Sequence, residues 1–239
     1  IYTAGLEKSP SVELIGSYLT PLLRSRATRA TIEGDPFRLD LRARHETLTA
    51  PAIRGAQDQR TSVLIVLMES VGAPFVDREQ TAMPFLRELG ERPGALRFLQ
   101  HYSTWSLTTK ALFSIICSEY PYPSYLPITR VNPRIPCESL SEILHAEGYR
   151  TGFISSQSLG YDEIEWFLAN RAFDHIVDAN SMPGREGAWF GKWGIDEAVT
   201  ARHVVDWIGQ DTSRPFFAIY GQLAGHHPYI ASREQEAAP

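Results

Sequence analysis

The chain has 239 residues, of which 43% are hydrophobic and 21% are charged, and its formal net charge at pH 7 is −5. This composition is typical of a globular protein with one sizeable core, and the acidic balance gives no indication of a nucleic-acid-binding surface. No apolar run approaches the roughly 18 residues that a membrane-spanning helix needs.

Residues 1–60 are expected to lead into the fold rather than to form its core. Residues 11–23 have the apolar spacing of a helix, and the stretch that follows is polar and rich in arginine. The chain begins at Ile1 without a signal peptide and ends soon after a histidine pair. We therefore expect a piece of a longer protein, with a lead-in or linker over 1–60 and a domain over 61–239.

The first predicted strand is the apolar run from Val63 to Met68, which we expect to be buried on both faces of a parallel sheet. It stops at Glu69, which is followed by Ser70 and a turn that contains glycine and proline. In open α/β sheets, ligands bind just beyond the carboxyl ends of strands. Glu69 is therefore a candidate metal ligand or general base, and a solvated acid that only ends the strand is equally compatible with this stretch.

From residue 62 onward, predicted strands and helices alternate, which indicates an α/β fold. The helices are expected over 83–92, 108–118, 139–147, 161–170 and 196–209, and the further strands over 96–102, 149–155, 175–177 and 215–220. Ser139 and Glu142 fit a capping box at the start of their helix. Three helices have apolar residues expected to face the core: Phe85, Leu86 and Leu89; Leu140, Ile143 and Leu144; and Val199, Val204, Val205 and Ile208.

The two cysteines, Cys117 and Cys137, enclose 19 residues that include five prolines. In an oxidising compartment a disulfide between them would stabilise the fold by about 3 kcal/mol, mainly by restricting the unfolded chain. Two separate buried thiols are equally compatible with the sequence. The chain has no Cys-x-x-Cys motif, so its cysteines give no indication of a structural zinc site.

A run of hydroxyl side chains leads into the helix that is expected from residue 108: Ser103, Thr104, Ser106, Thr108 and Thr109. The positive end of a helix dipole favours a bound phosphate or sulfate and helps a hydroxyl to ionise, so the run could contain a nucleophile. Serine and threonine are also the preferred N-cap residues, so such a run more often simply begins a helix.

A histidine pair, His226 and His227, directly follows the strand expected over 215–220. Histidines at the carboxyl end of a strand could act as metal ligand, general acid or substrate clamp, although a surface pair is more often inert. Here the pair, Glu69 and the hydroxyl run are all expected at one edge of the sheet. Their combination therefore predicts an active site at that edge.

Five motifs in this order resemble the sulfatase family of the alkaline phosphatase superfamily, and most closely its branch of lipoteichoic acid synthases and phosphoglycerol or phosphoethanolamine transferases. They are Val-Leu-Met-Glu-Ser at 66–70, Tyr-Ser at 102–103 before a helix that leads to Tyr-Pro, Gly-Tyr-Arg-Thr at 148–151, Trp-Gly-Ile-Asp at 193–196 and His-His-Pro-Tyr at 226–229. Each motif is weak alone, and the five in order are fairly specific.

The resemblance implies roles for three residues. Glu69 matches the acidic metal ligand after the first strand. Thr108 matches the nucleophile, because it lies 12 residues before Tyr120 as in that branch, where the threonine oxygen also contacts the metal. His226 matches the first residue of a His-x-Pro motif that contacts the anionic group or the leaving oxygen. The implied cofactor is a divalent metal ion, and the sequence does not distinguish Mn, Mg, Ca and Zn.

Neighbouring residues are further candidates. The adjacent Thr109 is the rival nucleophile, and Lys110 could either pair with the anion or be solvated at the surface. His227 and Trp193 are candidate substrate contacts, although for Trp193 and Asp196 we prefer a packed indole and a helix-capping carboxylate.

Two features depart from the family pattern. Formylglycine-dependent sulfatases carry Cys-x-Pro-Ser-Arg, whereas this chain has Thr-Thr-Lys-Ala-Leu at 108–112, which favours phosphoryl-type transfer through a threonine ester over sulfate-ester hydrolysis. The family also completes its metal site with an Asp-His pair on a later strand, and the chain reaches Pro239 without one. We therefore expect this piece to bind metal weakly and to turn over poorly.

The resemblance implies an α/β, alkaline-phosphatase-like, mostly parallel sheet flanked by helices, with residues 61–239 as the N-terminal part of a sulfatase-like catalytic domain. The implied function is a metal-dependent hydrolase or transferase of phosphate esters, of the phosphoglycerol or phosphoethanolamine type. The implied partners are an anionic phospholipid or an envelope glycan or polymer, in a parent protein anchored in a bacterial cell membrane with its domain on the periplasmic or extracellular side. A sulfuric ester hydrolase and a non-catalytic domain that binds an anionic envelope polymer are the alternatives.

Overall fold

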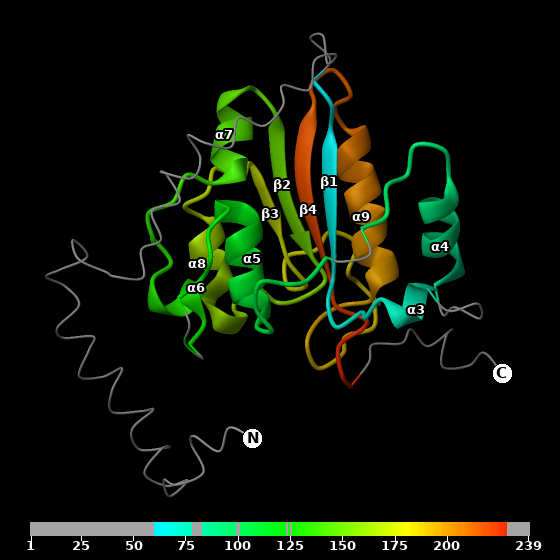
Figure 1. Ribbon diagram of the computed structural model, residues 1–239, viewed down its shortest axis with the longest axis horizontal. Helices are drawn as coiled ribbons and strands as arrows, with labels where there is room; N and C mark the ends of the chain where they lie inside the picture. The colour runs from blue at the N-terminus through cyan, green and yellow to red at the C-terminus, as the bar shows by residue number, and fades with distance from the viewer. Residues whose placement is uncertain (1–59, 78–82, 99–100, 123, 125, 229–239) are drawn as a thin grey trace, which may run out of the picture. The chain divides into compact units, whose positions relative to one another are not determined.

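The computed structural model describes residues 60–77, 83–98, 101–122, 124 and 126–228 (Figure 1). The helix expected over 11–23 and nearly all of the expected lead-in over 1–60 lie outside the described residues.

The centre of the fold is a sheet of four parallel strands. In spatial order they are β1 (Val63–Met68), β4 (Phe216–Gln222), β2 (Arg150–Ser155) and β3 (His175–Val177). The predicted alternation of strands and helices around a parallel sheet is therefore confirmed. Because all four strands run in one direction, their carboxyl ends meet at the same edge of the sheet, which is where ligand sites of such sheets lie.

Helices cover both faces of this sheet. They are α3 (Pro74–Asp77), α4 (Pro84–Glu91), α5 (Thr108–Cys117), α6 (Ile128–Val131), α7 (Leu140–Ala146), the 3-10 turn η1 (Tyr161–Glu163), α8 (Ile164–Leu168) and α9 (Glu197–Gly209). Alternate residues of β4 point to opposite faces, so Phe217 joins a core cluster with α5 and α8, and Ala218 joins a second cluster with α9. Helices α5 and α8 thus lie on one side of the sheet and α9 lies on the other.

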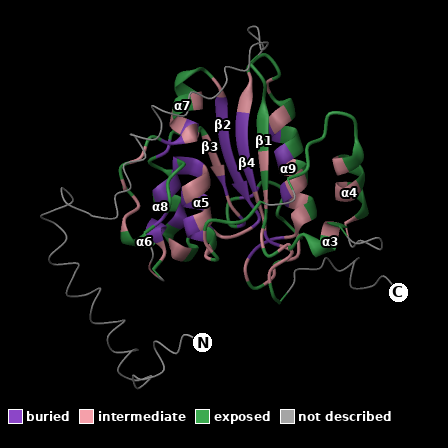
Figure 2. Ribbon diagram, in the orientation of Figure 1, coloured by how far each residue is buried: buried purple, intermediate pink, exposed green. Residues whose placement is uncertain are grey.

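The expectation that β1 is buried on both faces is wrong. Its side chains alternate between exposed and half-buried, and Leu64 and Val66 are 42% and 45% exposed (Figure 2). Among the described residues β1 has one neighbouring strand, β4, and the buried strands are β2 and β4. An apolar run shows that a strand suits the interior, but it does not show where in the sheet the strand lies.

Some predicted helix faces also differ. Helix α4 has no buried residue, and Phe85 is 83% exposed. On α9 the buried line runs through Thr200, Val204 and Trp207, which leaves Val205 67% exposed beside it. On α7, Ile143 is 43% exposed.

The strand expected over 96–102 does not form in its described part, because residues 96–98 and 101–102 have no regular structure. The structure confirms two predicted helix starts. Ser139 and Glu142 form the capping box at the start of α7, and Asp196 accepts a hydrogen bond of 2.9 Å from the backbone N–H of Ala198 at the start of α9.

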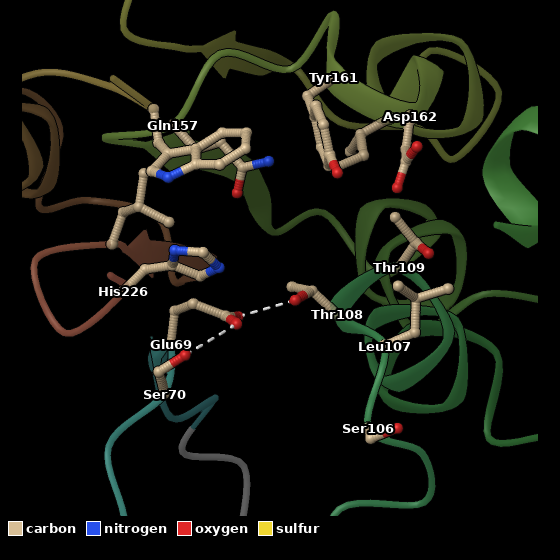
Figure 3. A pocket seen from close by; sticks show the side chains of 13 residues that line it. Glu69, Ser70, Ser106, Leu107, Thr108, Thr109, Gln157, Tyr161, Asp162 and His226 are labelled. Carbon is tan, nitrogen blue, oxygen red and sulfur yellow. Dashed lines mark hydrogen bonds between the residues drawn. The ribbon is translucent and has the colours of Figure 1, made fainter. Parts of the chain in front are cut away.

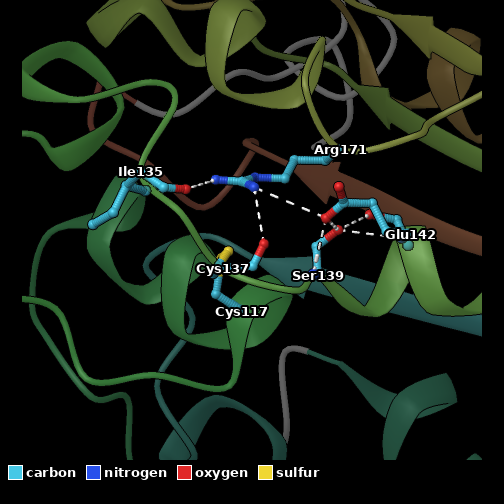
Figure 4. Close-up of a disulfide and its surroundings, with 7 residues drawn as sticks. Cys117, Ile135, Cys137, Ser139, Glu142 and Arg171 are labelled. Atoms are coloured by element: carbon cyan, nitrogen blue, oxygen red, sulfur yellow. Dashed lines mark hydrogen bonds and ion pairs between the residues drawn. A yellow bond between two sulfur atoms is a disulfide. The ribbon is translucent and has the colours of Figure 1, made fainter.

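A disulfide joins Cys117 at the end of α5 to Cys137, with 5.7 Å between their Cα atoms. The buried guanidinium of Arg171 donates to the carbonyl oxygens of Ile135, at 2.5 Å, and of Cys137, at 3.2 Å (Figure 4). It also lies over the ring of Phe167, 4.8 Å from its centroid. The disulfide and Arg171 therefore hold the proline-rich segment before α7 against α5 and α8.

Two other histidines, His175 on β3 and His203 on α9, contact each other. The Nε2 atoms of His175 and His203 are 3.0 Å apart, and the His175 ring stacks on Trp207. Burial lowers the pKa of both imidazoles, the charge of His203 lowers that of His175 further, and Asp206 partly opposes the shift at His203. The guanidinium of Arg150 lies over the ring of Trp207, so it adds a permanent positive charge near the two histidines.

This pair predicts a loss of stability in mild acid. Because both folded pKa values lie below the unfolded value near 6.5, the unfolded chain takes up more protons as the pH falls. The stabilisation is full above about pH 6.5 and is lost as the pH falls through the folded pKa values. We expect the free energy of unfolding in urea to be lower at pH 5 than at pH 7.5. The His175→Gln/His203→Gln variant should show a smaller difference, and an unchanged difference would contradict this assignment.

Candidate active site

A pocket of about 250 Å³ opens at the carboxyl ends of the strands (Figure 3). Its walls come from the end of β1, the start of α5, the segment between β2 and α8, the turn before α9 and the loop after β4. This volume is slightly below the usual range for small-molecule sites, so the pocket suits a small polar group rather than a whole lipid.

Glu69 and Thr108 meet in this pocket although 39 positions separate them in the sequence. The Thr108 hydroxyl donates a hydrogen bond of 2.9 Å to Glu69 Oε2, and the Ser70 hydroxyl lies 3.4 Å from Oε1 (Figure 3). Thr108 is the first residue of α5, where the leading backbone N–H groups have no partner within the helix. The hydroxyl thus has a proton acceptor on one side and a positive helix end on the other.

Thr108 and Thr109 have different environments. Thr108 is exposed to the pocket, whereas Thr109 is 1% exposed and its hydroxyl has no hydrogen-bond partner among the described residues. A nucleophile needs a base within hydrogen-bond reach. Thr108 meets this requirement, and the described contacts of Thr109 do not.

Lys110 is neither an anion contact nor a solvated surface residue, so both interpretations of it from the sequence are wrong. It is 1% exposed, and its ammonium donates to the carbonyl oxygens of Tyr122, at 2.8 Å, and of Ser124. The same ammonium lies 4.4 Å from the ring centroid of Trp105. Burial lowers the pKa of Lys110. Its role is to hold the segment after α5.

His226 lines the pocket, and its orientation is set by its neighbours. Its Nδ1 lies 2.7 Å from the carbonyl oxygen of His227, which can only accept, so Nδ1 carries the hydrogen. With this hydrogen on Nδ1, Nε2 is the ring nitrogen that can exchange a proton with a bound group. The Trp193 indole donates to the same carbonyl at 3.0 Å and meets the His226 ring edge to face, with 5.4 Å between centroids.

The prediction that His227 contacts substrate through its side chain finds no support in this geometry. The pocket is lined by His226 and Trp193, and the part of His227 that holds the site together is its backbone carbonyl.

Gly225 allows the loop after β4 to pass close to Glu69. A Cβ atom at this position would lie 2.5 Å from the Glu69 carbonyl oxygen and 3.0 Å from the Val71 side chain. Glycine is therefore required here, and it lets the backbone next to His226 lie against the backbone of Glu69.

Glu197, the first residue of α9, supports the same loop and was not identified from the sequence. Its Oε1 accepts from the Ser156 hydroxyl at 2.7 Å and from the backbone N–H groups of Leu223 and Ala224 at 2.5 and 3.0 Å. Its Oε2 accepts from the Tyr220 hydroxyl at 2.5 Å. Burial and the charge of Glu197 raise the pKa of Tyr220 far above its usual range.

Tyr161 and Asp162 also line the pocket and were missed. They follow β2 at the same edge of the sheet that pointed to Glu69, so the strand-end rule applied to the segment 156–162 would have found them.

The residues present fit a divalent metal ion only in part. Glu69 and Thr108 supply two oxygen donors of the kind that such ions bind, but the described residues contain no group of three His, Cys, Asp or Glu side chains that could hold a metal. A complete site would need ligands from outside the described residues.

The sequence model of the family called Sulfatase matches residues 61–238. Among solved structures, a protein in the alkaline phosphatase superfamily from Vibrio parahaemolyticus is 24% identical with a TM-score of 0.61, over 74% of this chain and 43% of that one. The lipoteichoic acid synthase LtaP from Listeria monocytogenes is 19% identical with a TM-score of 0.63, over 75% of this chain and 44% of that one.

The Streptococcus pyogenes phosphoglycerol transferase GacH, solved in complex with sn-glycerol-1-phosphate, is 13% identical with a TM-score of 0.51, over 74% of this chain and 48% of that one. This chain therefore spans less than half of the length of each of these proteins. At such identities the likeness concerns the fold, and it confirms the alkaline-phosphatase-like α/β architecture. Since the family match covers most of the chain and the solved structures share its fold, the chain belongs to the sulfatase family.

Proposed function

We propose that the protein is a metal-dependent hydrolase or transferase of phosphate esters, and that Thr108 is its nucleophile. The observation that carries this proposal is the hydrogen bond of 2.9 Å from the Thr108 hydroxyl to Glu69 at the start of α5, inside the pocket. A hydroxyl with a carboxylate acceptor and a helix N-terminus beside it is arranged to ionise and to receive an anionic group.

The proposed reaction has two steps. The Thr108 oxygen attacks phosphorus, its proton passes to Glu69, and the bond from phosphorus to the leaving alcohol breaks. His226, when protonated at Nε2, gives a proton to that alcohol. Water or an acceptor alcohol then attacks the phosphothreonine and loses its proton to His226, while the bond from phosphorus to the threonine oxygen breaks. The threonine oxygen takes back the proton from Glu69, which restores the Thr108 hydroxyl and releases the product.

A bound divalent ion would act as a Lewis acid that lowers the pKa of the threonine hydroxyl and polarises the phosphate. Glu69 and Thr108 are the residues of this chain that would contribute to holding it. The N-terminal part of a sulfatase-like catalytic domain, which we assign to residues 61–239, would then need partners from elsewhere in the protein.

The proposed substrates are an anionic phospholipid or an envelope glycan or polymer. LtaP and GacH, named for lipoteichoic acid synthesis and phosphoglycerol transfer, support this class of substrate. We place the domain on the outer side of a bacterial cell membrane, with residues 1–60 as its tether. Within the part of the chain that the structure describes, none of the helices has the length and apolar character needed to span a bilayer.

The test is the intact mass of the full-length catalytic domain after incubation with Mn²⁺ and a phosphodiester or an anionic phospholipid, followed by fragment mapping. We expect a covalent adduct on Thr108 that is absent from Thr108→Ala. Thr109→Val, which removes only the neighbouring buried hydroxyl, should keep the adduct. No adduct with any divalent metal, in a domain shown to be folded, would instead favour a non-catalytic domain that binds an anionic polymer.

A further inference from the structure

The described walls of the pocket carry no lysine or arginine side chain. The described residues that line it include the carboxylates of Glu69 and Asp162 instead. Two cations of neighbouring segments, Arg130 and Lys192, do not line the pocket and contact other side chains. An anion in this pocket would therefore take most of its hydrogen bonds from neutral groups of the protein.

Gln157 supplies a neutral amide to this pocket, and the proposed reaction does not yet use it. Figure 3 shows its side chain pointing into the pocket, toward the space between His226 and Tyr161. A primary amide has two N–H donors and one carbonyl acceptor. Among the described residues, none forms a hydrogen bond with this side chain, whereas the backbone of Gln157 is fully used. The amide is therefore available to a bound group.

Hydrogen bonds on both sides fix the backbone of Gln157. Its N–H donates to the Ser155 hydroxyl at 3.1 Å, and its carbonyl oxygen accepts from the N–H of Ala179 at 3.2 Å. Gln157 also forms an isolated antiparallel bridge with Gly194, where a Cβ atom would lie 1.9 Å from the Ser156 carbonyl oxygen. Only glycine allows this close approach, so the side chain of Gln157 enters the pocket from a backbone that is already in place.

Gln157 and Thr108 reach the same space from different elements. Thr108 begins α5, whereas Gln157 follows β2, and both line the pocket. A phosphate that the Thr108 oxygen attacks has non-bridging oxygens that carry its negative charge. Donors held in place before the reaction, including the amides of asparagine and glutamine, stabilise such oxygens strongly in a transition state. Gln157 has the chemistry and the fixed backbone that this role requires.

We propose that Gln157 is a further catalytic residue, whose side-chain amide donates a hydrogen bond to a non-bridging oxygen of the phosphate while Thr108 attacks it. This inference rests on the proposed function, because the phosphate belongs to the ester that Thr108 would attack. The amide stays neutral through both steps and neither gains nor loses a proton. Because its backbone is fixed beforehand, the hydrogen bond favours the transition state over the free ester.

The experiment measures the rate of adduct formation on Thr108 in the full-length protein with Mn²⁺ and a phosphodiester. Gln157→Met keeps the length of the side chain and removes its donors, so we expect the rate to fall about 100-fold. Gln157→Glu keeps the shape almost unchanged but places a carboxylate against the phosphate, so the loss should be at least as large. If Gln157 only filled space, Gln157→Glu would react at nearly the wild-type rate.

The matched control is Gln210→Met, which makes the same chemical change at an exposed residue directly after α9. It should leave the rate unchanged, and the melting temperatures of all variants should stay close to that of the wild type. A Gln157→Met variant that reacts within threefold of the wild type, or a Gln157→Glu variant that reacts as fast as the wild type, would overturn the role of Gln157. Both outcomes would leave the Thr108 chemistry standing.

A binding measurement separates the two proposals if the wild type forms no adduct. The affinities of orthovanadate, which resembles the transition state, and of inorganic phosphate are measured by calorimetry in the presence of Mn²⁺. Gln157→Met should weaken orthovanadate binding about 100-fold and phosphate binding less than 10-fold. Without an adduct, such a loss would still support Gln157 as the contact of the anion, in a domain that does not catalyse the reaction. Unchanged affinities for both anions would contradict that contact.

Discussion

Replacing Glu69 with glutamine is expected to lower turnover by about 1000-fold or more, which corresponds to about 4 kcal/mol of transition-state stabilisation. Glutamine keeps the size of the side chain, and its amide oxygen can still accept the Thr108 hydrogen bond of 2.9 Å. Glutamine has no negative charge, so it can neither accept the proton of Thr108 nor attract a divalent cation. The expected loss is therefore chemical rather than structural.

Two measurements separate these effects. The melting temperature of Glu69→Gln should stay close to that of the wild type, because Glu69 is half-buried and its carboxylate contacts are to hydroxyls. Its affinity for Mn²⁺ should fall more than about 100-fold, since even residues that only orient a metal ligand contribute 10- to 100-fold. The matched control is Glu91→Gln on α4, where the carboxylate pairs with the exposed Arg87. Turnover of Glu69→Gln within tenfold of the wild type would contradict the assigned role.

Glu69 and His226 could be predicted as site residues because each directly follows an apolar run that forms a strand, and the end of a parallel strand has a known place in the fold. Glu69 follows β1 and His226 follows β4, and these strands are hydrogen-bonded neighbours. In a parallel sheet, neighbouring strands bring their carboxyl ends together, so two polar residues that follow apolar runs are expected to meet. The same rule, applied to β2, would have added Tyr161 and Asp162 to the candidates.

Helix rotation and long-range contacts explain why the sequence did not reveal the positions of Lys110 and β1 or the role of Glu197. Each residue turns about 100° around a helix, so Lys110 lies on the opposite side of α5 from Thr108 and cannot reach the same pocket. For Glu197, no local pattern shows that its carboxylate accepts from Leu223 and Ala224, 26 and 27 residues away. The position of β1 in the sheet is likewise set by which strands pair, and its apolar run contains no information about that.

Glu197 and Gly225 together explain how the site is assembled. Gly225 lets the loop after β4 pass against the backbone of Glu69, and Glu197 fixes the start of the same loop from the other side of the sheet edge. The backbone N–H of His226 then donates to the Leu223 carbonyl at 2.9 Å. The imidazole position thus depends on a carboxylate that does not line the pocket.

Replacing Glu197 with leucine is therefore expected to destabilise the fold by about 3 kcal/mol or more. Leucine has nearly the same size, but it removes the acceptor of four donors: the Ser156 and Tyr220 hydroxyls and the N–H groups of Leu223 and Ala224. The Ser156 hydroxyl can still donate to the Gly221 carbonyl oxygen at 3.3 Å, so three donors lose the acceptor that the structure gives them. Each unsatisfied buried donor costs roughly 1–3 kcal/mol. Glu197→Gln should cost much less, because its amide oxygen can accept from three of these donors while its amide nitrogen donates to the Tyr220 oxygen.

Asp196, the residue before Glu197, provides the control for this prediction. Asp196→Ala removes the N-cap of α9 and should cost about 1 kcal/mol without affecting the loop after β4. Urea unfolding ranks the three variants, and turnover is measured well below each melting temperature, so that the unfolded fraction does not contribute. Glu197→Leu should lose turnover in its folded state because His226 is displaced, whereas Asp196→Ala and Glu197→Gln should keep it. If folded Glu197→Leu retained full turnover, His226 would not depend on this carboxylate for its position.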